Sequence, residues 1–239
     1  MQQNKINILS TRPLSKELIH AAAEKNIFIE SISFIETEMI VDENLKEKIK
    51  NLSHHSLNIV FTSMNAVEAV TKYLNGIKPN WKIFCIGNTT KKLTEENFAK
   101  NSIARTADSA SALANVIISE KNISSVVFFC GNQRRDELPE KLLHHNIEVK
   151  EMVVYKTIPS SHQITKDYDG IIFYSPSAVN SFFSVNKINQ RTILFAIGNT
   201  TATEMKKFVP NKIIIANEPS KKLLAEQAIN YFEIQPTHN

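Results

Sequence analysis

The chain repeats three short blocks in the same order, each displaced by 111 or 112 residues. Written with their copies, the blocks are FCIGNTT at 84–90 and FAIGNTT at 195–201, FTSMNAV at 61–67 and FYSPSAV at 173–179, and SASALA at 109–114 and SKKLLA at 220–225. Three collinear matches in nearly one register favour an internal duplication over chance. The sequence therefore predicts two related units, each with at least three strand-turn-helix elements.

Short apolar runs alternate with longer amphipathic stretches along the chain, a pattern that predicts βα units and parallel sheets flanked by helices. Predicted strands are Ile6–Leu9, Ile27–Ile29, Asn58–Phe61, Lys82–Ile86, Ser102–Ala104, Ser125–Cys130, Glu148–Glu151, Gly170–Tyr174, Thr192–Ile197 and Lys212–Ala216. Predicted helices are Ser15–Lys25, Ser63–Leu74, Thr89–Ala99, Ser109–Glu120, Arg134–His145, Ser177–Val185, Thr200–Phe208 and Ser220–Phe232. Ten strands in two related units give five per unit, and 239 residues are enough for two such domains.

Two segments with alternating patterns, 33–41 and 152–161, have little helical character and are predicted to be extended connectors that pair with each other. The predicted domains are then 40–152, inserted as one α/β domain, and 1–35 with 160–239, a discontinuous α/β domain. Two connecting strands between two domains predict a hinge, and a cleft between the domains would be the natural ligand site.

Composition excludes several classes of function. The 42% hydrophobic and 22% charged residues are ordinary for a soluble globular protein, and no apolar run approaches the roughly 20 residues of a membrane span. Because the N-terminus also lacks the features of a secretory signal, we expect a cytoplasmic protein without membrane contact. A net charge of +4 spread along the chain argues against nucleic acid but suits a small polyanion.

Histidine and cysteine patterns give no metal or redox site. The neighbours His54 and His55, like His144 and His145, lack the spacing that puts two ligands on one helix face, so no metal is expected. Cys85 and Cys130 lie in apolar strand-like runs, where buried structural thiols are expected.

Three of the five glycines, Gly87, Gly131 and Gly198, follow an apolar run and precede an asparagine. In a parallel sheet these positions are the carboxyl ends of strands, where ligands bind, and the helix N-termini that follow favour anions. Gly followed by Asn, Thr or Ser is also the turn and cap chemistry of any βα unit, so both interpretations stay open. The chain has neither a GxGxxG nor a Walker motif, which argues against a nucleotide phosphate.

Several side chains near these strand ends could meet a ligand. Ser63, Ser175 and Ser177 follow strands but lack a GxSxG frame, so they are not expected to be nucleophiles. Tyr155 falls in the predicted connector, where its phenol could face the cleft and donate a proton to a departing oxygen, or could be an ordinary aromatic of a β-ribbon. Arg12, in STRP, and the pair Arg134 and Arg135 are placed to meet carboxylates or to lie on the surface.

Taken together, these residues resemble the uroporphyrinogen-III synthase family. The resemblance covers nearly the whole chain and rests on ordered short motifs: TRP at 11–13, FTSMNAV at 61–67, IGNTT at 86–90, the frame Gly131, Arg135, Leu138, Leu142, Ile147, Val149, Tyr155 and Thr157, FYSPSAV at 173–179, IGNTTA at 197–202 and EPSKKLLAEQAI at 218–229. Asn146 replaces the glycine usual in the family at the end of that helix, and Asn tolerates the left-handed conformation.

The resemblance implies two flavodoxin-like domains with parallel five-stranded sheets, joined by a two-stranded β-ladder hinge. It implies a monomer without cofactor that cyclises hydroxymethylbilane, a linear tetrapyrrole polycarboxylate, to uroporphyrinogen III. The hydroxyl is lost, the azafulvene electrophile is attacked by the substituted carbon of ring D, and a spiro intermediate reopens with ring D inverted. Carried over by motif, Tyr155 is the candidate acid. The candidate binders of acetate and propionate groups are Arg12, Ser63, Thr90, Arg135, Ser175, Ser177, Thr200 and Thr201.

A second class of function stays open at this point, a non-enzymatic two-domain protein that closes around an anionic metabolite. The absence of a signal sequence argues against a transport version of that protein. Turnover of hydroxymethylbilane separates the two classes.

Overall fold

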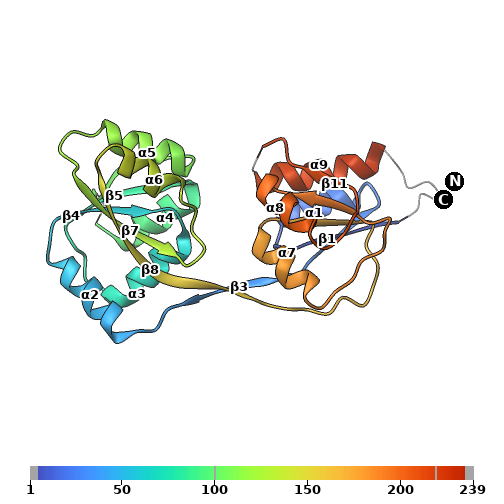
Figure 1. Cartoon of the computed structure of the whole chain (residues 1–239), viewed down its shortest axis with the longest axis horizontal. Helices are drawn as coiled ribbons and strands as arrows, with labels where there is room; N and C mark the ends of the chain where they lie inside the picture. Colours follow the sequence, from blue (N-terminus) through green and yellow to red (C-terminus); the bar gives the residue numbers. More distant parts are fainter. Residues whose placement is uncertain (1–4, 100, 219, 235–239) are drawn as a thin grey trace. The chain divides into compact units, whose positions relative to one another are not determined.

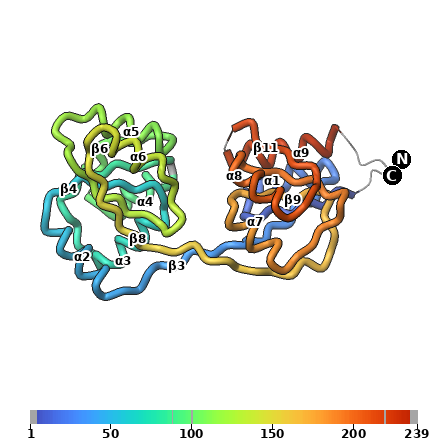
Figure 2. Tube along the Cα trace, viewed as in Figure 1, coloured from blue at the N-terminus to red at the C-terminus, as the bar shows by residue number. Residues whose placement is uncertain are grey.

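The computed structural model describes residues 5–99, 101–218 and 220–234. The chain divides into two compact units, which are drawn in sequence colours in Figures 1 and 2. Unit 1 consists of Met1–Glu36 and Ile158–Asn239, and unit 2 consists of Thr37–Thr157. Unit 1 is therefore built from both ends of the chain, and unit 2 from one continuous segment.

Unit 1 is a five-stranded parallel sheet with helices on both faces. Its strand order is β11 (Ile213–Ile215), β10 (Ile193–Ala196), β9 (Gly170–Phe173), β1 (Ile6–Ser10) and β2 (Ile27–Ser31). Helices α1 (Lys16–Ala23) and α9 (Lys221–Ile234) contribute Ala22 and Leu224 to one core cluster. Helices α7 (Pro176–Phe183) and α8 (Asn199–Met205) contribute Phe182 and Met205 to the cluster on the other face.

Unit 2 has the same layered construction around a second sheet. Its strand order is β3 (Ile35–Met39), β8 (Glu148–Pro159), β7 (Ser125–Gly131), β4 (Leu57–Phe61), β5 (Trp81–Ile86) and β6 (Ile103–Ala107). The described helices that pack with one core cluster are α2 (Glu43–Ser53), α3 (Met64–Leu74) and α4 (Asn88–Asn97). Helices α5 (Ala110–Ser119) and α6 (Glu137–His144) pack with the cluster on the other face.

The predicted α/β class with parallel sheets is confirmed, and each predicted strand overlaps an observed one. Counted along the chain within unit 1, the strand order is 2-1-3-4-5, which is the flavodoxin order. Unit 2 differs from this expectation, because its five parallel strands, numbered along the chain from β4 to β8, have the order 3-2-1-4-5. The repeated blocks explain why the two strand orders differ. In the sheet of unit 2, β4 and β5 occupy the places that β9 and β10 occupy in unit 1. The two sheets are therefore equivalent, but the first strand along the chain has a different place in each.

The second sheet has a sixth strand, β3, where five were predicted. Ile40 N–H donates to Val154 O and Ser160 N–H donates to Phe34 O, both at 3.0 Å. Residue numbers rise along one segment as they fall along the other, so β3 runs antiparallel to β8. The predicted strand 148–151 and connector 152–161 are one element, since β8 runs without a break to Pro159.

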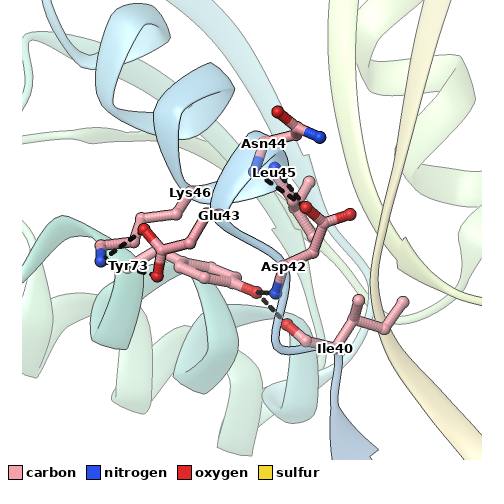
Figure 3. A network of polar contacts seen from close by, with 7 residues as sticks. All are labelled: Ile40, Asp42, Glu43, Asn44, Leu45, Lys46 and Tyr73. Atoms are coloured by element: carbon pink, nitrogen blue, oxygen red, sulfur yellow. Dashed lines mark hydrogen bonds and ion pairs between the residues drawn. The ribbon is translucent and has the colours of Figure 1, made fainter.

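Helix α2 has no counterpart among the predicted helices, and Figure 3 shows the contacts at its start. Asp42 Oδ1 accepts hydrogen bonds from Asn44 N–H at 2.8 Å and Leu45 N–H at 3.4 Å, which satisfies two free amides of the first turn. The Tyr73 hydroxyl donates to Ile40 O and accepts from Asp42 N–H. The cap residue and the tyrosine of α3 together fix where α2 begins.

Candidate functional site

The repeated blocks lie at the carboxyl ends of the strands in both units. In unit 2, Phe61 of β4 pairs with Cys85 of β5 and with Phe129 of β7, so the carboxyl ends of these three strands lie at the same edge of the sheet. In unit 1, Phe173 of β9 pairs with Ala196 of β10. Chain order reverses at β4 and β7 in unit 2 and at β9 and β1 in unit 1. Such reversals are where ligands bind in open α/β sheets.

Tyr155 lies at the reversal of unit 2, against the last residue of β7. Cys130 pairs with Val153 but Gly131 pairs with Tyr155, so β8 has an extra residue at this point. A bulge of this kind redirects a side chain to the other face of the sheet. A Cβ at Gly131 would lie 2.5 Å from Cζ and 2.8 Å from the hydroxyl oxygen of Tyr155. The phenol therefore occupies space that any other residue at 131 would fill.

Tyr155 contacts both the core of unit 2 and the loop after β7. The side chain is half-buried and packs against the core cluster that α3 covers, so it does not stand free of the sheet. The loop after β7 fixes its backbone, because Asn132 N–H donates to Tyr155 O at 3.2 Å and Asn132 Oδ1 accepts from Thr157 N–H at 2.8 Å. Asn132 is not among the site residues predicted from the sequence.

The two arginines after Gly131 have different surroundings, and both precede α6 instead of starting it. Arg134 forms ion pairs with Glu151 and Asp136, and these carboxylates raise the pKa of its guanidinium. Arg135 is exposed, and the described residues offer it no ion pair. Of the two, Arg135 is therefore the one whose charge is available to an anion.

Ser63 and Ser175 occupy equivalent places in the two repeats, and each caps the helix that follows it. Ser63 Oγ accepts a hydrogen bond from Asn65 N–H and Ser175 Oγ accepts one from Ala178 N–H, each at 3.2 Å. Both are N-caps, of α3 and α7, which supports the cap interpretation of these positions. Each hydroxyl hydrogen remains available as a donor, so the cap contact is compatible with a bound carboxylate.

The threonines of the repeated IGNTT blocks differ in exposure. Thr90 in α4 is buried, Thr200 in α8 is exposed, and Thr201 is fully buried with a hydroxyl that has no hydrogen-bond partner among the described residues. Ser177 is half-buried in the first turn of α7. Gly87 has a φ of 71°, where glycine is favoured, whereas the backbone at Gly198 is extended and places no such demand.

At the reversal of unit 1, hydrogen bonds hold the loop after β1 to β9. Thr11 donates to Ile172 O from its N–H at 3.0 Å and from its hydroxyl at 2.8 Å, and Ser10 Oγ donates to Arg12 O at 2.6 Å. Tyr174, directly after β9, is buried, and no described residue provides a hydrogen-bond partner for its hydroxyl. Burial raises the pKa of Tyr174, against a smaller opposite effect of Ser10 and Arg12.

Among the described residues, no His, Cys, Asp and Glu side chains gather into a group of three or more that could hold a metal. The helices within the described ranges are too short or too polar to cross a membrane. In each unit by itself, the candidate residues at the strand ends offer hydroxyls, amides and arginine side chains, and unit 2 adds the phenol of Tyr155.

A family model described as "Uroporphyrinogen-III synthase HemD" matches residues 17–226 of the chain, well over half of its length. The chain belongs to the uroporphyrinogen-III synthase family. This assignment confirms the resemblance found in the sequence and the expectation of an enzyme of tetrapyrrole biosynthesis.

Individual members of the uroporphyrinogen-III synthase family are distant in sequence. The uroporphyrinogen-III synthase of Chlorobaculum parvum is 25% identical over 169 residues, which are 62% of this chain and 69% of that protein. The structure of the Helicobacter pylori synthetase has a TM-score of 0.62 at 18% identity, over 95% of this chain and 99% of that one. A mutant synthase from Thermus thermophilus has a TM-score of 0.61 at 15% identity, over 97% and 100%. At these identities the structures establish the fold.

Proposed function

We propose that the protein cyclises hydroxymethylbilane to uroporphyrinogen III, with loss of water and inversion of ring D. The observation that carries the proposal is the phenol of Tyr155, which lies on Gly131 at the strand reversal of unit 2. This is where a parallel sheet binds its ligand, and the residue type can donate a proton there.

In the proposed mechanism Tyr155 donates its proton to the departing hydroxyl of hydroxymethylbilane. The C–O bond breaks, water leaves, and an azafulvene electrophile remains. The substituted carbon of ring D attacks it, and the spiro intermediate reopens and closes again with ring D inverted. The proton lost when the last pyrrole regains aromaticity returns to the phenolate, so the cycle consumes no cofactor.

Selection between isomers requires control of shape, because the azafulvene can also close without help to the symmetrical isomer I. We propose that the strand-end loops of both units bind acetate and propionate groups and bring the ring-D carbon close to the electrophile. The proposed ligands are Arg12, Ser63, Thr90, Arg135, Ser175, Ser177, Thr200 and Thr201. The hydroxyl donors left on the two capping serines and the available charge of Arg135 support this assignment.

The proposal includes a domain organisation. Residues 1–35 with 160–239 form one domain with the flavodoxin strand order, residues 40–152 form a second α/β domain with the order 3-2-1-4-5, and the paired segments 33–41 and 152–161 are the hinge. The antiparallel bonds between β3 and β8 support the pairing. We propose a cytoplasmic monomer, and light scattering on the purified protein tests the monomer.

The test supplies hydroxymethylbilane, oxidises the products and separates the isomers by chromatography. We expect isomer III in excess and formed faster than the spontaneous product. If isomer I alone appears, at the rate seen without protein, the enzyme proposal is wrong and a non-enzymatic binder of anionic metabolites becomes the better interpretation.

Tyr155→Phe tests the role of the phenol. We expect kcat to fall by about 100-fold or more, as for loss of a general acid, with a much smaller change in the Kd of the product. The matched control is Tyr231→Phe on α9, which also removes a phenol hydroxyl. That hydroxyl accepts a hydrogen bond from Lys212 Nζ at 3.1 Å, and its loss should leave kcat unchanged. Equal losses in kcat and in binding would instead make Tyr155 a positioning residue.

A further inference from the structure

Three polar residues belong to neighbouring elements at the strand reversal of unit 1, where α9 packs in one core cluster with β9 and β1. Tyr174 follows β9 and belongs to the core cluster that also holds Leu224 and Ala225 of α9. Arg12 follows β1, the strand beside β9, and its loop is bonded to Ile172 through Thr11. Lys221 is the first residue of α9.

Within the described part of the chain, none of these three groups has the partner that its chemistry calls for. The Tyr174 side chain is 8% exposed, and its buried hydroxyl makes no hydrogen bond to a described residue. Burying a hydroxyl without a partner is unfavourable, so such a group in a native structure needs an explanation. Across the same residues neither Arg12 nor Lys221 forms an ion pair, whereas the adjacent Lys222 pairs with Glu226 at 3.6 Å.

The charge of Arg12 acts on both of the other groups. The pKa of Lys221 is lowered, first by loss of solvation at its ammonium group and then by the charge of Arg12, although much of the side chain is exposed. Ser10 first and then Arg12 act to lower the pKa of Tyr174, against the larger effect of burial. The Ser10 hydroxyl hydrogen is itself donated to Arg12 O at 2.6 Å, so it leaves the phenol without a hydrogen-bond partner among the described residues. Two cations that repel each other beside an unpaired O–H donor would all be stabilised by one anion.

We propose that Arg12, Lys221 and Tyr174 form a binding site for one carboxylate of the substrate. The proposal rests on the proposed function, which supplies a substrate with acetate and propionate groups, and it adds Lys221 and Tyr174 to the binding residues. The two cations would pair with the carboxylate, and the phenol would donate a hydrogen bond to one of its oxygens. The site belongs to unit 1 alone, because the repeat places Thr62 of FTSMNAV where unit 1 has Tyr174.

The test uses uroporphyrin III, the stable oxidised form of the expected product, as a fluorescent probe of binding to the full chain. We expect Lys221→Gln to raise the Kd about five- to tenfold and to reduce the salt dependence of binding, since a charge-assisted contact is lost. Tyr174→Phe, which keeps the ring and removes only the hydroxyl, should raise the Kd about threefold. The matched control is Lys222→Gln, one residue along the same helix, which should change the Kd by less than about twofold.

A double-mutant cycle adds a second readout. If one carboxylate bridges the two cations, Arg12→Gln with Lys221→Gln should weaken binding by less than the product of the two single effects. Far-UV circular dichroism of each variant shows whether it is folded. A Lys221→Gln protein that binds uroporphyrin III like Lys222→Gln, or a cycle with fully multiplicative effects, would overturn the proposal.

The site and the proposed function can fail separately. If the wild-type protein forms isomer III but Lys221→Gln and Tyr174→Phe leave the Kd unchanged, the enzyme stands and the carboxylate site is wrong. If the wild-type protein forms no isomer III while uroporphyrin binding still depends on Lys221, the carboxylate site stands and the enzyme proposal is wrong.

Discussion

Because Tyr155 packs directly on Gly131, a substitution at Gly131 tests the proposed catalytic role of Tyr155. In Gly131→Ala the new Cβ would lie 2.5 Å from Cζ of Tyr155, too close for any real contact, so the phenol must move. Displacement of a catalytic group by about 1 Å can cost on the order of 100-fold in rate. We therefore expect kcat of Gly131→Ala to approach that of Tyr155→Phe in the isomer assay.

Gly170→Ala is the matched control, because it overpacks the core at a position with no proposed catalytic role. Its Cβ would lie 2.7 Å from Cε2 of Phe232 in the core of unit 1. We expect a loss of about 1–3 kcal/mol of unfolding free energy in urea, as is typical of an overpacked core, with kcat per folded molecule unchanged. If Gly131→Ala loses stability but keeps kcat, Tyr155 does not act through this position.

At the residue scale, the hydroxyl side chains at strand ends could be predicted from the sequence, but the residues that contact the candidate side chains could not. Ser63 and Ser175 could be selected because each follows an apolar run and precedes a helix. The contact of Tyr155 with Gly131 could not be predicted, since it depends on a bulge that shifts the register of β8 by one residue. Tyr174 was assigned to the end of a strand, and nothing in the sequence marks its hydroxyl as unpaired.

At the scale of elements, helix α2 depends on one side-chain cap. Asp42→Ala removes the acceptor of two first-turn amides, at 2.8 and 3.4 Å, and loss of such a cap costs about 1 kcal/mol of unfolding free energy. Fluorescence of Trp81, the only tryptophan, reports this change in urea because it lies in unit 2 and donates to Leu52 O at the end of α2. Asp42→Asn keeps an acceptor and should retain most of the stability; if it is as unstable as the alanine variant, the cap is not the cause.

The end of α5 is tied to two strands by a cluster that should respond to acid. Glu120 pairs with Lys82 of β5 at 2.7 Å and with Arg105 of β6 at 3.1 Å, and the hydrogen bond from Lys82 is the main cause of a pKa below the ordinary 4.5. A lowered folded-state pKa means that the pair stabilises the protein above the unfolded pKa and loses this effect as pH falls through the folded value.

Glu120→Gln should therefore be less stable than the wild type at pH 7, and the difference should shrink as the pH falls below the ordinary carboxyl pKa of 4.5 and through the lower folded-state pKa. Urea titrations followed by Trp81 fluorescence across this pH range measure it. Glu96→Gln, at an exposed carboxylate for which the described residues provide no ion pair, is the control and should show no such trend. A difference that persists unchanged into acid would mean that Glu120 acts by packing.

Elements whose sequence is a plain apolar run were predicted well. Elements that mix apolar and charged residues, or whose pairing partner is distant in sequence, were not. The parallel strands are short apolar runs, and their type and order along the chain could be predicted. Helix α2 has an apolar stripe at Leu45, Ile49 and Leu52 behind its aspartate cap, so the signal was present, but its many lysines and glutamates resemble a solvated linker. Strand β3 reads as a connector because its hydrogen-bond partner is distant in sequence.

At the scale of the whole molecule, the duplication explains both what could be predicted and what could not. The repeated blocks give two units of one architecture, and their strand ends coincide in the structure with equivalent serine caps. The order of strands in each sheet could not be predicted, because the same repeat is compatible with the orders 2-1-3-4-5 and 3-2-1-4-5. Only β1 and β2, which come from the other end of the chain, distinguish them.

Two units with separate core clusters predict two separable unfolding transitions. Both thiols and Trp81 belong to unit 2, and burial raises the pKa of Cys85 and Cys130 to about 11, so neither should react with a thiol reagent at pH 8 until unit 2 opens. In urea, thiol labelling and Trp81 fluorescence should therefore change together. Ser15→Ala removes the cap of α1 in unit 1. It should shift only the part of the far-UV circular dichroism transition that does not coincide with the change in Trp81 fluorescence. If Ser15→Ala moves the Trp81 transition as far as Asp42→Ala does, the units unfold as one, and the stability of either depends on the other.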